Sequence, residues 1–192
     1  MSEKNFSENK TKGRMNLKSS TQTLAVMAIL IAAQIVISQF FTFHVWNLKI
    51  TLSFIPVVIA ARMYGAVGGA LVAGIGDIIG VILHPVGPWF PPITISIMLV
   101  GVMFGLFLKK SDSIWRIVVS ILISEFVFSL FVTPLWITML YREEADFFAY
   151  YFSLVLTRIG IQIIPMTIVK FVIIIPMLKA MDRLKFVQRI TA

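Results

Sequence analysis

The chain has 192 residues, of which 58% are hydrophobic and 14% are charged, and its mean hydropathy is +0.92. Soluble domains are roughly half apolar and about a quarter charged, so this composition indicates a membrane protein with no room for a soluble catalytic domain. The absence of cysteine excludes disulfides, thiolate nucleophiles and cysteine-based metal sites.

Long apolar runs predict an all-α integral membrane protein with about six spans, because a helix needs roughly 20 residues to cross a bilayer. The second run is short and is expected to be tilted or partly shielded. The stretch from His84 to Pro92 holds four of the eight prolines and is predicted to be a loop. The predicted spans cover residues 21–43, 50–62, 64–84, 93–108, 114–140 and 150–175, with a helical tail to 184.

Basic residues are distributed unevenly about these spans, which predicts the orientation of the chain. With both ends in the cytoplasm, 13 of the 17 lysines and arginines lie inside, whereas Lys49 and Arg142 lie outside. We expect a multi-pass plasma-membrane protein with a basic cytoplasmic tail (1–18), a membrane domain (19–185) and a cytoplasmic C-terminal tail (186–192). The inside residues are Lys4, Lys10, Lys12, Arg14, Lys18, Arg62, Lys109, Lys110, Arg116, Lys179, Arg183, Lys185 and Arg189.

Small residues mark two predicted spans as sites of close helix packing. Six glycines lie between residues 65 and 80, which indicates either tight packing or a helix that shifts against its neighbours. In the first span, Ala28 and Ala32 are four residues apart and share one stripe of the helix. That stripe predicts either an internal contact or a docking surface for a partner protein.

Four ionisable residues fall inside predicted spans, where a charge costs at least ~2.5 kcal/mol and is therefore a functional candidate. Asp77 and Arg158 each lie roughly 10 Å below the outer end of their span, so we expect both to contact a ligand. Glu125 and Lys170 lie deeper, and there we expect a structural ion pair or a buried hydrogen bond. A structural role stays open for all four.

Aromatic residues gather in the outer half of the predicted membrane domain. Most of them fit an interfacial belt. Trp89, however, lies in the proline-rich loop, and Trp136 follows Pro134 inside a span. Aromatic rings on stiff backbone near buried charges favour a flat heteroaromatic ligand in a mostly apolar pocket.

No catalytic motif is apparent. The sequence has no P-loop, HExxH or GxSxG, and two histidines are too few for most transition-metal sites. We therefore expect no enzyme activity, no metal and no cofactor, and any ATP hydrolysis would occur in partner subunits. The basic residues that produce the net charge of +8 lie at the ends of the predicted spans, and this distribution argues against nucleic-acid binding.

A series of short motifs extends over most of residues 20–182. The most specific are Gly76-Asp-Ile-Ile-Gly80 and His84-Pro-Val-Gly-Pro-Trp-Phe-Pro91, and the others are Leu24–Ala33, Leu48–Pro56, Tyr64–Ala70, Gly101–Leu108, Leu135–Trp136, Thr157–Arg158 and Pro165. By these motifs the chain resembles the S components, the substrate-binding subunits, of energy-coupling-factor (ECF) vitamin transporters, and within them the folate group. It departs from the group pattern at Thr133, where members often carry Asn, and at Pro92, where they carry Gly.

The resemblance implies a six-transmembrane-helix S-component fold that captures folate, or a reduced folate, from outside the cell for ATP-driven uptake. It implies as partners a transmembrane coupling subunit and two cytoplasmic ATPase subunits, assembled in the lipid bilayer. Ala28 and Ala32 would then form the docking face for the coupling subunit.

The resemblance also implies roles for individual residues. Asp77 would accept N–H bonds from the pterin edge, the rings of Trp89 and Trp136 would cover its faces, and Arg158 or Lys49 would attract the folate carboxylates. The expected substrate-binding residues are Asp77, His84, Trp89, Phe90, Thr94, Thr133, Trp136, Arg158, Gln162, Trp46 and Lys49.

Two other functions stay open at this point. One is an S component for a different vitamin, such as riboflavin or pantothenate. The other is an autonomous ion-coupled transporter that uses the carboxylate of Asp77 or Glu125, although the chain is short for such a protein.

Overall fold

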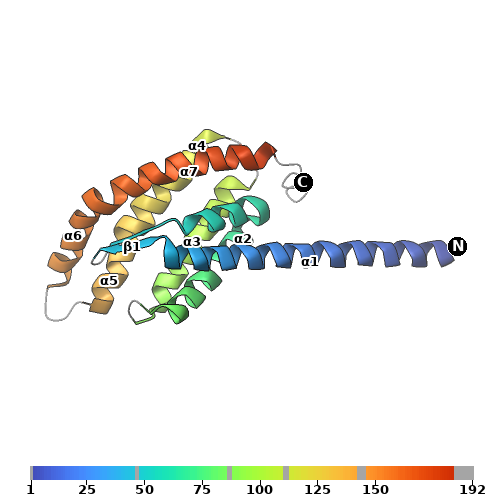
Figure 1. Cartoon of the computed structure of the whole chain (residues 1–192), viewed down its shortest axis with the longest axis horizontal. Helices are drawn as coiled ribbons and strands as arrows, with labels where there is room; N and C mark the ends of the chain where they lie inside the picture. The colour runs from blue at the N-terminus through green and yellow to red at the C-terminus, as the bar shows by residue number, and fades with distance from the viewer. Residues whose placement is uncertain (1, 46–47, 86–87, 110–112, 142–145, 184–192) are drawn as a thin grey trace.

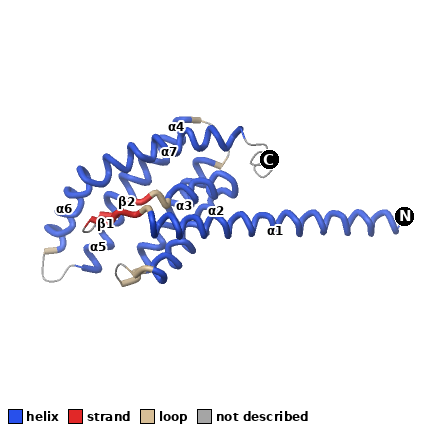
Figure 2. The backbone as a smooth tube through the Cα atoms, in the orientation of Figure 1, coloured by secondary structure: helices blue, strands red, loops and turns tan. Residues whose placement is uncertain are grey.

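The chain is almost entirely helical in its described part, with one small β-hairpin (Figures 1 and 2). The computed structural model describes residues 2–45, 48–85, 88–109, 113–141 and 146–183, with the backbone alone described at 2–20, 42–45, 48–50 and 182. The elements in chain order are α1 (Ser2–Phe40), β1 (Thr42–Val45), β2 (Leu48–Thr51), α2 (Phe54–Leu83), α3 (Pro91–Leu108), α4 (Ile114–Leu122), the π-helical η1 (Ile123–Val132), α5 (Thr133–Tyr141), α6 (Phe147–Arg158), the π-helical η2 (Ile159–Ile163) and α7 (Ile164–Arg183).

Five helical stretches within these residues are long and apolar enough to cross a membrane. They confirm the predicted class, an integral membrane protein built from helices. The count of six spans stays a prediction, because one assigned helix, α2, covers most of both predicted spans 50–62 and 64–84. The five stretches are Thr21–Phe40, Phe54–Leu83, Pro91–Leu108, Ile114–Tyr141 and Phe147–Met181.

Helix α2 is divided at Gly65, whose φ of 75° and ψ of −155° are not helical. Glycine adopts a positive φ without the steric cost of a Cβ. A Cβ built on Gly69 would lie 3.1 Å from the Cβ of Ala61, although eight residues of continuous helix span about 12 Å. The chain therefore turns back at Gly65, the second residue of the predicted span 64–84, and the two parts of α2 pack against each other.

Close packing continues between α2 and α3. A Cβ on Gly101 would collide with the backbone of Gly69, and a Cβ on Gly105 would collide with that of Ala66. Glycine at these positions lets the two helix backbones approach each other directly. Of the two interpretations of the glycine-rich span, tight helix packing is the one that this contact supports.

The N-terminal segment differs from the sequence-based expectation in two ways. Helix α1 begins at Ser2, so residues of the predicted basic tail are helical, and this part extends away from the other helices (Figure 1). The first span ends at Phe40 rather than at 43, because β1 and β2 form an antiparallel hairpin in which Phe43 pairs with Ile50. The predicted domain boundaries stay predictions, and residues 186–192 lie outside the described part.

Proline accompanies both π-helical segments. Segment η1 ends two residues before Pro134, and η2 ends two residues before Pro165. A proline ring clashes with the carbonyl four residues earlier and donates no backbone N–H, so the preceding turn widens. Pro176 lies within α7 without such a segment, so proline alone does not produce one.

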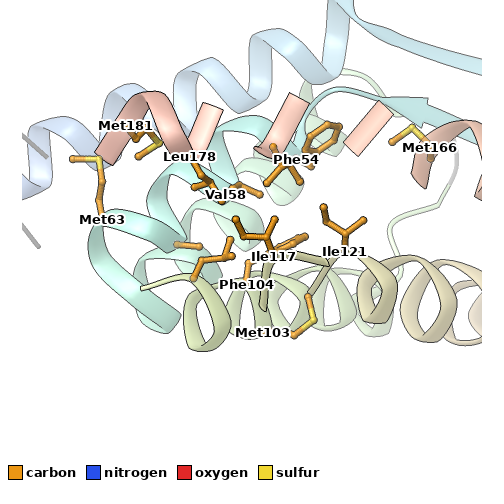
Figure 3. Packing of buried hydrophobic residues seen from close by; sticks show 13 residues of the cluster. Phe54, Val58, Met63, Met103, Phe104, Ile117, Ile121, Met166, Leu178 and Met181 are labelled. Atoms are coloured by element: carbon orange, nitrogen blue, oxygen red, sulfur yellow. The ribbon is translucent and has the colours of Figure 1, made fainter. Parts of the chain in front are cut away.

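A hydrophobic core joins α2, α3, α4 and α7 (Figure 3). The side chains of Phe104, Leu108, Ile121 and Ile174 in this cluster are fully buried. Phe54 and Phe104 also line the large cavity described below. The core therefore holds one end of that cavity at a fixed position. The rest of the buried cluster is Phe54, Val58, Ala61, Met63, Met103, Ile117, Met166, Leu178 and Met181.

Candidate ligand-binding cavity

A cavity of about 610 Å³ lies between the helices. Small-molecule sites in proteins have volumes of about 300–1,000 Å³, with mostly apolar walls and a few polar groups. Every helix except α4 contributes to the lining, and so does η1. Segments far apart in the sequence thus meet at one place, as a binding site requires. The predicted site residues that line it are Asp77, His84, Trp89, Phe90, Thr94, Thr133, Arg158 and Gln162.

Asp77, Trp89 and Thr94, here called the Asp77 group, form a hydrogen-bonded chain on the cavity wall. The Thr94 hydroxyl donates to Oδ2 of Asp77 at 2.8 Å and accepts from Nε1 of Trp89 at 3.1 Å. Pro91 and Pro92 begin α3 and so fix Thr94 in its first turn. Thr94 is 4% exposed, and Asp77 has no cationic partner among the described residues. Among the described residues, the carboxylate is therefore held by one neutral donor, the Thr94 hydroxyl, and faces no counter-charge.

Trp136 lies next to this wall but does not line the cavity in the part of the chain that the structure describes. Its indole Nε1 donates to the hydroxyl of Ser96 at 2.9 Å, and its ring lies 6.3 Å from that of Phe90 at an interplanar angle of 60°. Ser96 and Phe90 both line the cavity. Trp136 is thus placed to support a cavity wall, and the expected contact with a ligand face stays a prediction.

Arg158 is the last residue of α6 and Gln162 lies within η2, and both contact Ser129 of η1. Arg158 is 3% exposed, and its Nη1 donates to the backbone carbonyl of Ser129 at 3.3 Å. Nε2 of Gln162 donates to the Ser129 hydroxyl at 3.5 Å. All three residues line the cavity, and Thr133 in the next turn donates to the carbonyl of Phe128 at 2.9 Å. The widened turns therefore bring a buried cation and an amide to one side of the cavity.

Glu125 and Lys170 form an ion pair at the same cavity. Nζ of Lys170 lies 2.5 Å from Oε1 of Glu125 and donates to the Ser124 hydroxyl at 3.1 Å. The ammonium also lies 5.5 Å and 6.0 Å from the ring centroids of Phe54 and Phe104. An ion pair is one of the two arrangements expected at this position, and its opposite charges compensate each other.

Sequence reasoning missed three polar residues of α1 that line the cavity, Gln34, Ser38 and Gln39. Gln34 is buried, and its amide donates to the carbonyl of Ala73 at 3.4 Å, while Gln39 donates to that of Gly80 at 3.1 Å. A Cβ on Gly76 would collide with the Gln34 amide. A polar side chain inside an apolar span needs a hydrogen-bond partner, as a charged one does. The argument that identified the charged residues within spans would therefore also have identified the polar residues of α1.

The remaining predicted site residues are placed only in part. His84 is exposed at the end of α2, where its Nδ1 lies 3.2 Å from the carbonyl of Leu83. Trp46 lies outside the described residues, and Lys49 is described only as backbone in β2. Ala28 and Ala32 are both exposed on α1, away from the cavity lining.

Comparison with known proteins assigns the chain to a family. The family model for the substrate-specific component of ECF transporters matches residues 22–178. The chain belongs to the substrate-specific components of ECF transporters. This family assignment confirms the resemblance read from the motifs, and the matched region contains every described element of the ligand cavity.

Individual relatives of this S component carry a more specific name. The folate transporter FolT of Clostridium novyi is 28% identical over 115 residues, covering 59% of this chain and 67% of the relative. The folate transporter FolT of Leuconostoc mesenteroides is 26% identical over 141 residues, covering 72% of this chain and 76% of the relative. A crystal structure of FolT bound with folic acid superposes with a TM-score of 0.68 at 28% identity, covering 79% of this chain and 93% of that one.

Proposed function

We propose that this S component captures folate, or a reduced folate, from outside the cell for uptake by an ECF transporter. The observation that carries the proposal is a cavity of about 610 Å³ that is lined by the carboxylate of Asp77, which has no cationic partner among the described residues, and by the buried guanidinium of Arg158. Folate has a pterin edge rich in N–H donors and a tail with two carboxylates, so it carries the complementary groups at its two ends. The relatives named FolT support the same ligand.

At the pterin end, Asp77 accepts two N–H bonds from the ring edge. The hydrogen bond from Thr94 holds one carboxylate oxygen in a fixed direction, and Trp89 in turn holds Thr94. A hydrogen bond to an ionised acceptor contributes about 1.5–3 kcal/mol, more than one between neutral groups. The rings of Trp89 and Phe90 in the cavity wall provide flat apolar surface for the faces of the pterin.

At the tail end, Arg158 binds a folate carboxylate, and Lys49 is the second candidate cation. Arg158 lines the cavity beside Gln162 and Ser129, where a carboxylate is removed from water and a charge-assisted bond is strong. This arrangement predicts that removal of the Arg158 charge weakens the binding of folate but not of a pterin without carboxylates.

Uptake needs partner subunits, because the sequence carries no P-loop for ATP hydrolysis. We infer that a transmembrane coupling subunit and two cytoplasmic ATPase subunits supply the energy. The exposed pair Ala28 and Ala32 on α1 is the proposed docking face, since small side chains allow another helix to approach closely. The bias of basic residues supports a cytoplasmic location of both chain ends.

Titration of the intrinsic tryptophan fluorescence of the purified protein tests the ligand. Folic acid, riboflavin, thiamin, biotin and pantothenate are added separately, and we expect saturable quenching by folic acid alone at submicromolar concentration. A Trp89→Phe variant shows whether the signal arises in the cavity. A response to another vitamin would show that the substrate is that vitamin and not folate. Uptake into liposomes that is driven by an ion gradient without any ATPase would show an ion-coupled transporter instead of an S component.

Docking is tested separately with bulky substitutions on α1. Ala28→Trp and Ala32→Trp are expected to retain folate binding but to lose uptake and co-purification with the coupling subunit. Ile29→Trp, at an exposed position about 100° around the helix from Ala28 and about 60° from Ala32, is the matched control and is expected to behave as wild type. Normal uptake by both alanine variants would contradict the docking proposal.

A further inference from the structure

A second cavity, of about 390 Å³, lies at the other end of α3 from Thr94. The 18 residues of α3 span about 27 Å, so this cavity and the Asp77 group belong to opposite membrane faces. The distribution of basic residues assigns the second face to the cytoplasm. The lining residues are Tyr64, Ala66, Val67, Gly105, Leu106, Lys109 and Arg116.

The polar groups of this cavity are all hydrogen-bond donors. Lys109 follows the last residue of α3, Arg116 lies in the first turn of α4, and neither has a carboxylate partner among the described residues. The hydroxyl of Tyr64 is shielded from solvent and has no hydrogen-bond partner there. Two cations and an unpartnered hydroxyl in one cavity are suited to an anion with several acceptor oxygens, such as a phosphate.

The turn at Gly65 creates the space for this arrangement. The side chain of Lys109 crosses Gly65 so closely that its Nζ would lie 3.1 Å from a Cβ built there. Because Gly65 lacks a Cβ, the side chain of Lys109 can cross the turn next to Tyr64 while it remains exposed. The positive φ that folds α2 back thus also positions a cation.

The apolar wall of the same cavity distinguishes a lipid from a free ion. Val67 and Leu106 line the cavity and are 70% and 69% exposed, on stretches that cross the membrane. Trp115 beside Arg116 is also exposed, as is typical of tryptophan at the level of lipid headgroups. A free phosphate would make no use of the exposed valine and leucine, whereas the acyl chain of a phospholipid would cover them.

We propose that this cavity, formed by Tyr64, Lys109 and Arg116, binds the phosphate of an anionic phospholipid of the cytoplasmic leaflet, with an acyl chain along Val67 and Leu106. Cationic pockets between helices on the cytoplasmic side are suited to such headgroups. The site is separate from the ligand cavity, so the proposal stands independently of the identity of the vitamin.

Native mass spectrometry of the full chain in detergent tests the site, with phosphatidylglycerol and phosphatidylcholine added in turn. The wild-type protein is expected to retain one phosphatidylglycerol in preference to phosphatidylcholine. The double variant Lys109→Gln/Arg116→Gln is expected to bind phosphatidylglycerol about thirtyfold more weakly, and Tyr64→Phe about threefold more weakly. An unchanged thermal unfolding midpoint verifies that the variants are folded.

The matched control is Lys179→Gln/Arg183→Gln, which removes two exposed cations outside the cavity. It is expected to keep the lipid preference. An equal loss of phosphatidylglycerol binding in both double variants would show that net charge alone attracts the lipid, and it would contradict the proposed site. Equal retention of the two lipids by wild type, or an unchanged preference in Lys109→Gln/Arg116→Gln, would also overturn it. Displacement of phosphatidylglycerol by inorganic phosphate alone would identify a free-anion site instead.

Discussion

Two acidic residues face the same cavity in opposite electrostatic situations. Asp77 is held by the hydroxyl of Thr94, which the indole of Trp89 fixes in turn, and no cation faces it among the described residues. Glu125 is held directly by the ammonium of Lys170 and is only 2% exposed. The first arrangement leaves a negative charge available to a ligand, and the second uses the charge within the protein.

The difference explains why burial alone does not identify a binding residue. A buried charge is a functional candidate by default, and Asp77, Glu125, Arg158 and Lys170 meet that criterion equally in the sequence. The partners separate them, because a compensated ion pair gains little from a ligand, whereas Asp77 has one neutral donor and no counter-charge among the described residues. Three predictions follow from this contrast, beginning with the largest effect.

Removal of one charge from the ion pair is expected to cost the most stability. Lys170→Met leaves Glu125 buried without its cation, and breaking a buried pair in this way costs about 3–5 kcal/mol. Thermal unfolding in detergent should show a clear drop of the midpoint. The double variant Glu125→Met/Lys170→Met should recover most of the loss, and Lys179→Met, on the exposed part of the same helix, should be neutral. An equal loss in the single and double variants would refute the account of the pair.

Removal of the Arg158 charge is expected to weaken folate binding without unfolding the protein. Arg158→Gln loses a charge-assisted contact, so the Kd for folate should rise about tenfold to hundredfold. Competition with hydroxymethylpterin, which has no carboxylate, should be unaffected, and Arg183→Gln is the control at an exposed arginine. If both ligands lose affinity equally, Arg158 does not act on the tail.

Removal of the Thr94 hydroxyl is expected to have the smallest effect. Thr94→Val keeps the shape of the side chain but removes the donor to Asp77 and the acceptor for Trp89. The Kd for folate should rise about threefold to tenfold, as for the loss of a single hydrogen bond. Thr157→Val, whose hydroxyl bonds the carbonyl of Ser153 outside the cavity, should bind as wild type. Unchanged binding by Thr94→Val would show that the hydroxyl does not orient the carboxylate.

The sequence predicted the membrane class and the family, because apolar runs and short motifs are local properties of the chain. It also located Asp77, Arg158, Glu125 and Lys170, since charge inside an apolar run is visible without coordinates. The division of α2 at Gly65 agrees with the predicted boundary between residues 62 and 64.

Features that depend on three-dimensional contacts were not predicted. Residues 42–43 and 50–51 of the β1–β2 hairpin were assigned to the ends of two spans, because Phe43 and Ile50 are apolar enough to continue them. The π-helical turns before Pro134 and Pro165 bring Ser129 to Arg158 and Gln162, and no local pattern gives that pairing. The hydrogen bond between the indole of Trp136 and the hydroxyl of Ser96, a residue of the cavity wall, was not predicted either, and the expected contact of Trp136 with a ligand stays a prediction.

The most direct test is to measure the Kd for folate of two variants, Asp77→Asn and Glu125→Met/Lys170→Met. It decides which of the two acidic residues binds the pterin. We expect Asp77→Asn to raise the Kd for folate about tenfold to hundredfold with an unchanged unfolding midpoint, because the carboxylate of Asp77 binds the pterin. The double variant, which removes the neutralised pair, should bind folate within about threefold of wild type. Wild-type affinity in Asp77→Asn together with a large loss in the double variant would contradict the account and assign the pterin to Glu125.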